Sequence, residues 1–231
     1  MAKHQSNRGK PKQIDLAVLE TAEWYKGDRI MTVRPLFQQL MQSVTDDANR
    51  FHYATFTGPD SFEETLRDLV HTHGVQYIYI STHGEEGKMQ FSFNRQKKAT
   101  YLSKFDCLAE KSLSGVFFAG CQLGPLAKKV SARLRDKVKG QAPWFAGYET
   151  SVGWIDAAFL DLAFLRLVLL HEEYEDLKVI KSQNDIRQAL DVFDEGVEGI
   201  FPPFGEVRWD LGLSFYVNGK KIDIYEEDET E

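Results

Sequence analysis

Short apolar runs alternate with helix-like segments along the chain, and this alternation restricts the fold more than any other feature of the sequence. Five runs have the length and the β-branched, aromatic and aliphatic content of single strands: 14–19, 51–57, 75–81, 116–119 and 144–148. Helix-like stretches follow them, at 32–43, 60–73, 103–111, 124–137 and 155–173. Strands joined through helices run parallel. The sequence therefore predicts an α/β fold, a three-layer sandwich with a mostly parallel central sheet and helices on both faces.

Turn-forming residues predict two hairpins. Asn218-Gly219 lies between two strand-like runs and is a strong signal for a type I′ turn, so we expect a C-terminal β-hairpin. A smaller hairpin is expected where runs 89–94 and 99–102 flank a polar turn at 95–98.

The chain length of 231 residues suits one α/β domain with a large core. Residues 1–13 are basic and polar, and residues 226–231 are nearly all acidic, so both are expected to be solvated tails. We therefore predict a single domain at 14–225, with a core at 14–175 and a C-terminal extension at 176–225.

Charge and cysteine content restrict the partners and the compartment. The formal net charge is −7, which does not favour nucleic acid as a partner. The basic residues of the segment 124–137 are interpreted as the solvated face of an amphipathic helix. The chain has two cysteines and an N-terminus without the apolar stretch of a secretory signal, so we expect a reducing, cytoplasmic setting.

The segment 154–170 is apolar enough to require a membrane check. Asp156, Asp161 and Arg166 interrupt it, and three charged groups in hydrocarbon would be costly, so we predict a buried core helix and no membrane partner. The segment is apolar on more than one face, which indicates cover either by residues after Lys178 or by a regulatory protein partner. We favour the cover within the chain.

Two of the predicted strands end in short turns that carry reactive side chains. The run 75–81 leads to Thr82-His83-Gly84, and the run 116–119 leads to Gly120-Cys121-Gln122. Active groups gather at the carboxyl ends of parallel strands, and a thiol becomes a competent nucleophile when an imidazole takes its proton. Glycine beside each group lets a substrate approach the backbone closely.

At these residues the sequence resembles the caspase-like (clan CD) cysteine peptidases, in particular their bacterial CHAT branch, which is itself similar to the separases. Tyr77-Ile-Tyr-Ile-Ser-Thr-His83-Gly84 is similar to the family's histidine strand and turn, and Gly115-Val-Phe-Phe-Ala-Gly-Cys121-Gln is similar to its cysteine strand. Trp144-Phe-Ala-Gly-Tyr148 and the apolar helix after it resemble the next strand and helix of CHAT domains. The resemblance covers residues 14–175, and only the two turns are specific.

The sequence departs from metazoan caspases at two positions and in one spacing. Gly120 replaces the alanine before the cysteine, Leu123 replaces a glycine, and His83 precedes Cys121 by 38 positions where caspases have about fifty. These differences argue against a caspase of that type and leave the broader superfamily open.

The resemblance implies a cysteine endopeptidase that cuts a protein substrate. Cys121 would attack the scissile carbonyl, His83 would protonate the leaving amine, and the backbone N–H groups of Gly84 and Cys121 would form the oxyanion hole. As for many CHAT proteins, the expected setting is a bacterial defence or cell-death pathway. No cofactor or metal is implied.

Specificity is predicted from the loop after the run 144–148. Relatives that cut after Arg or Lys have a carboxylate in the pocket for the residue before the scissile bond, and this loop offers Glu149 and Asp156. The resemblance therefore implies a basic preference, although Asp156 is equally suited to capping the following helix.

Two further hypotheses use the same fold: an inactive caspase-like binding or scaffold module, and an unrelated sheet that binds a small ligand. The presence of both His83 and Cys121 favours the enzyme. His71 and His73 face different directions on a helix and make a poor metal pair. Cys107 has no histidine at useful spacing, and the glycine-rich turn lacks the residues of a phosphate loop.

Overall fold

A seven-stranded sheet forms the centre of the molecule. The structure, a computed structural model, describes residues 14–22, 32–91, 102–109, 112–170, 188–190, 193 and 212–222. The strands lie in the order β2-β1-β3-β6-β7-β8-β9, and the first five of these are parallel. Their bounds are β1 Leu16–Thr21, β2 Phe51–Phe56, β3 Tyr77–Ser81, β6 Gly115–Ala119, β7 Trp144–Tyr148, β8 Leu213–Val217 and β9 Lys220–Lys221. The predicted mostly parallel sheet is confirmed.

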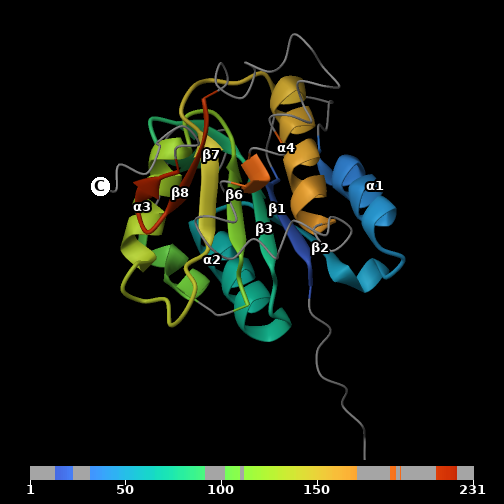
Figure 1. The fold of residues 1–231 in the computed structure, drawn as a ribbon, viewed down its shortest axis with the longest axis horizontal. Coiled ribbons are helices and arrows are strands. Elements are labelled where there is room, and N and C mark those ends of the chain that lie inside the picture. The colour runs from blue at the N-terminus through green and yellow to red at the C-terminus, as the bar shows by residue number, and fades with distance from the viewer. Residues whose placement is uncertain are drawn as a thin grey trace, which may run out of the picture.

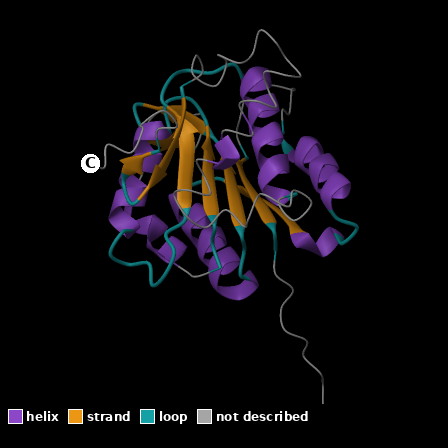
Figure 2. Cartoon of the chain, in the orientation of Figure 1, coloured by secondary structure: helices purple, strands orange, loops and turns teal. Residues whose placement is uncertain are grey.

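Helices cover both faces of this sheet (Figures 1 and 2). One face packs against α1 (Arg34–Val44) and α4 (Trp154–Leu169). The other packs against α2 (Pro59–Asp68) with its continuation η2 (Leu69–His73), the 3₁₀ helix η3 (Leu102–Ala109) and α3 (Gly124–Leu134). A short 3₁₀ turn, η1 (Ala48–Arg50), precedes β2. The result is the predicted three-layer sandwich.

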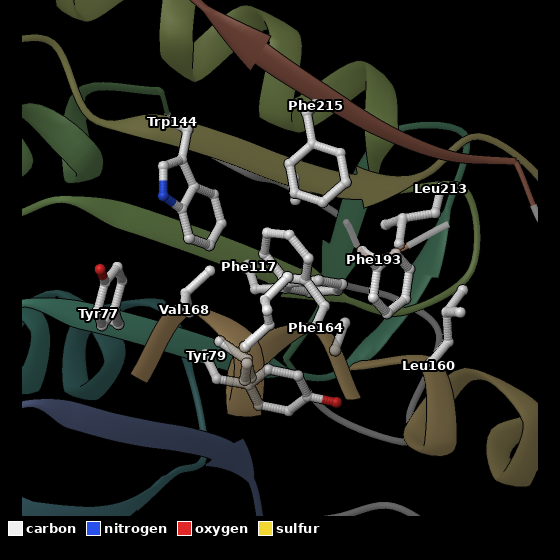
Figure 3. Packing of buried hydrophobic residues seen from close by; sticks show 14 of the residues in the cluster. Tyr77, Tyr79, Phe117, Trp144, Leu160, Phe164, Val168, Phe193, Leu213 and Phe215 are labelled. Atoms are coloured by element: carbon white, nitrogen blue, oxygen red, sulfur yellow. The ribbon is translucent and has the colours of Figure 1, made fainter. Parts of the chain in front are cut away.

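Aromatic rings fill the layer between the sheet and α4 (Figure 3). Phe164 of α4 lies 4.8 Å from Phe215 and 5.6 Å from Trp144, measured between ring centroids. Phe193, which follows Lys178 in the chain, packs edge-on against Phe164 at 5.7 Å, so part of α4 is covered from within the chain as predicted. Ile155 and Phe159 of the same helix remain 59% and 68% exposed.

One of the two predicted hairpins is confirmed. β8 and β9 pair antiparallel around Asn218 and Gly219, whose φ angles of 53° and 78° are those of a type I′ turn.

The second predicted hairpin, of 89–94 with 99–102, falls mostly on residues 92–101, which lie outside the described part of the chain. Within the described part, β5 (Lys88–Gln90) pairs antiparallel with β4 (His83–Glu85), and Leu102, the end of the second predicted run, begins η3. His83 therefore stands at the start of a strand in a small hairpin, where the sequence predicted a simple turn.

In the described part of the chain, no helix is both long enough and apolar enough to cross a membrane.

Candidate active site

A cavity of about 200 Å³ opens where β3 and β6 end and α4 begins. His83 contributes to its lining from one strand end, Cys121 from the next, and Trp154 from the first turn of α4. The structure therefore brings the predicted nucleophile and the predicted base to one cavity.

The register of β3 and β6 explains why these two residues line one cavity. Ser81 lies opposite Ala119, at the last residue of each strand. The pairing continues one step further, because the Thr82 N–H donates to the Ala119 carbonyl at 3.1 Å. The two turns thus leave the sheet side by side, as expected for the carboxyl ends of adjacent parallel strands.

Two glycines let the backbones of these turns touch. A Cβ on Gly84 would lie 2.0 Å from the Cys121 carbonyl oxygen, and a Cβ on Gly120 would lie 2.1 Å from the Thr82 carbonyl oxygen. Backbone oxygens cannot yield as a flexible side chain can, so any side chain at either position would push the turns apart. Glycine at these two positions therefore brings the two turns into contact.

The sulfur of Cys121 contacts the backbone of the loop between β7 and α4. The Val152 N–H donates to Sγ at 3.4 Å, and Sγ lies 3.6 Å from the Val152 carbonyl oxygen. These two contacts hold the sulfur beside the β7–α4 loop. α3 begins at Gly124, three residues after Cys121.

A buried carboxyl group also lines the cavity. Asp161 of α4 is 1% exposed and accepts hydrogen bonds from the hydroxyls of Tyr79, at 2.7 Å, and Tyr148. Figure 3 shows the Tyr79 hydroxyl at the edge of the aromatic cluster. Burial raises the pKa of Asp161 to about 7, so its protonated and ionised forms are both populated near neutral pH.

Sequence reasoning missed this role of Asp161. The aspartate was counted only as an obstacle to a membrane span, although an acidic residue inside a mostly apolar helix was a usable signal for a buried functional group.

The two acids predicted for the substrate pocket do not line this cavity. Glu149 accepts a hydrogen bond from the Tyr216 hydroxyl at 2.6 Å and pairs with Lys221 at 3.3 Å. Asp156 is exposed in the first turn of α4, where its charge suits the helix dipole. Among the described residues, the cavity lining includes Asp161 and neither of these two acids.

Cys107 and His73, two further reactive residues considered from the sequence, do not line the cavity. Burial raises the pKa of Cys107 to about 11, and its sulfur lies 3.7 Å from the Lys104 carbonyl oxygen. His73 lies 3.6 Å from Asp68. Across the described ranges, the structure holds no group of three or more His, Cys, Asp or Glu side chains suited to a metal ion.

Comparison of the chain with protein-family models and with curated protein sequences finds no match.

Proposed function

We propose that this protein is a cysteine endopeptidase in which Cys121 and His83 act together on a protein substrate. The observation that carries the proposal is the shared cavity, because Cys121 and His83, from adjacent strand ends, both line the same small volume. Two loops in backbone contact fix the positions of the two residues, which is the preorganisation that nucleophilic catalysis requires.

The chemistry of the proposed reaction has two stages. The Cys121 thiolate attacks the scissile carbonyl carbon, the carbonyl electrons move to oxygen, and the C–N bond breaks as protonated His83 donates its proton to the leaving amine. Neutral His83 then takes a proton from water, which attacks the thioester and releases the acid and the thiolate.

The developing oxyanion needs two N–H donors. In a hairpin with a two-residue turn, the two residues that flank the turn form backbone hydrogen bonds with each other across the strands, and the next cross-strand pair of residues does not. Here Glu85 and Lys88 flank the turn, so the N–H of Gly84 points away from β5. With the N–H of Cys121, it is our proposed oxyanion hole.

The buried acid supports a preference for a basic residue before the scissile bond. A guanidinium entering the cavity would meet Asp161 in a site from which most water is excluded, where ionic attraction is stronger than at the surface. Ionisation of Asp161 would then be favoured by the bound charge and by the two tyrosine hydroxyls.

A panel of fluorogenic peptides tests this proposal. We expect cleavage after Arg, and we expect Asp161→Asn to lower kcat/KM for that peptide by about 50-fold, since a charge-assisted hydrogen bond is removed while the shape is kept. The exposed Asp156→Asn is the matched control and should retain the wild-type rate. Cleavage after Asp but not after Arg would reverse the specificity, and failure to cleave any peptide would argue against a peptidase.

A further inference from the structure

Gln122, the residue after the nucleophile, contacts the hairpin that carries His83. Its side-chain oxygen accepts the Glu86 N–H at 3.0 Å, and its backbone oxygen accepts the Gly87 N–H at 2.9 Å. Both N–H groups at the tip of the β4–β5 turn are therefore bound by one residue of the cysteine turn.

The same residue is tied to the loop on the other side of the cavity. The Gln122 N–H donates to the Thr150 carbonyl at 2.8 Å, two residues before Val152, whose N–H contacts the Cys121 sulfur. Gln122 thus joins three segments at one point: the histidine hairpin, the cysteine turn and the β7–α4 loop.

Two residues of this connection, Gln122 and Glu86, have backbone φ angles that are unusual for residues other than glycine. Gln122 has a φ angle of 57° and Glu86 one of 51°, in the left-handed region that glycine adopts most easily. Side chains other than glycine persist there when surrounding contacts hold them, and such positions cluster at functional sites. At both positions, the hydrogen bonds between Gln122 and the hairpin tip are contacts of this kind.

We infer that Gln122 is a positioning residue that docks the β4–β5 hairpin on the cysteine turn and thereby fixes His83 relative to Cys121. The inference rests on the proposed function, because it assigns Gln122 to the alignment of that pair. Gln122 itself takes no part in bond making.

The rate of Cys121 alkylation by iodoacetamide in the full chain tests the inference. We expect Gln122→Gly to lower the His83-dependent part of this rate by about tenfold, the equivalent of one hydrogen bond. Its melting temperature should stay within about 4 °C of wild type, because glycine relieves the positive φ angle. Gln122→Glu keeps an acceptor oxygen and should stay within about twofold of the wild-type rate, with Glu86 amide exchange still slow.

Asn218→Gly is the matched control, since Asn218 also has a positive φ angle, 53°, in a hairpin tip away from the cavity. It should keep the alkylation rate within about twofold, and the melting temperature within about 4 °C, of the wild-type values. A wild-type alkylation rate in Gln122→Gly would overturn the positioning role. If alkylation of the wild-type protein does not depend on His83, that result contradicts the proposed function instead. The docking contact would still be shown in that case if Glu86 amide exchange is slow in the wild-type protein and fast in Gln122→Gly.

Discussion

Cys121→Ala and His83→Ala are each expected to lower kcat for a cleaved peptide by about 10⁴-fold, and the double substitution is expected to lower it no further. Groups that act as a unit in one step lose most of their joint effect when either is removed. The measurement is a double-mutant cycle of steady-state rates at saturating substrate. Cys107→Ser is the control, because that thiol lies outside the cavity and its raised pKa keeps it protonated.

Two results would contradict a dyad. Hydrolysis undiminished in Cys121→Ala would exclude the sulfur as nucleophile. Independent losses that multiply in the double variant would mean that the thiol and the imidazole serve different steps.

Gly84→Ala is expected to lower the free energy of unfolding by about 3 kcal/mol and to abolish peptide cleavage. The added Cβ would lie 2.0 Å from the Cys121 carbonyl oxygen and 2.6 Å from Cγ of Leu123, so the histidine turn must move away from the cysteine turn. Thermal or urea unfolding followed by circular dichroism measures the loss.

Gly58→Ala is the matched control for this substitution. Gly58 precedes α2, and a Cβ there meets no atom within 4 Å, so the expected cost is at most about 1 kcal/mol, from the weaker helix cap. Equal destabilisation by the two substitutions would show that the contact between the turns does not determine the fold of the site.

The position of the candidate dyad was predictable from local sequence. Both relevant strands are continuous apolar runs that end abruptly in small or polar residues, and parallel neighbours must present their ends at one edge. His83 and Cys121 follow those ends by two residues each, and the pairing of β3 with β6, which the structure supplies, places them side by side.

The acid in the cavity depends on contacts that a local pattern does not contain. Tyr79 lies 82 positions from Asp161 in the sequence, and the packing of α4 on the sheet decides which of its acidic residues becomes buried. Asp156 and Asp161 differ by five positions, which places them on different faces of the helix. Of the two, Asp156 is exposed and Asp161 lines the cavity.

The hairpin that carries His83 was missed for a similar reason. Glu86-Gly87 is a weaker turn signal than Asn-Gly because glutamate seldom adopts a positive φ angle. The partner that holds Glu86 in this conformation is Gln122, 36 positions later in the chain. The Asn218-Gly219 turn has the residue types that a type I′ turn favours, and it was predicted correctly.

The proposed mechanism requires one cavity to bring a nucleophilic sulfur, an imidazole and two N–H donors to the same carbonyl group. A crystal structure of the full chain with a bound peptide aldehyde that ends in arginine would show whether it does. We expect a covalent bond from Cys121 Sγ to the aldehyde carbon, its oxygen facing the N–H groups of Gly84 and Cys121, and the His83 ring in contact with the adduct. An aldehyde bound without a bond to Cys121, or an adduct beyond the reach of His83, would contradict the account.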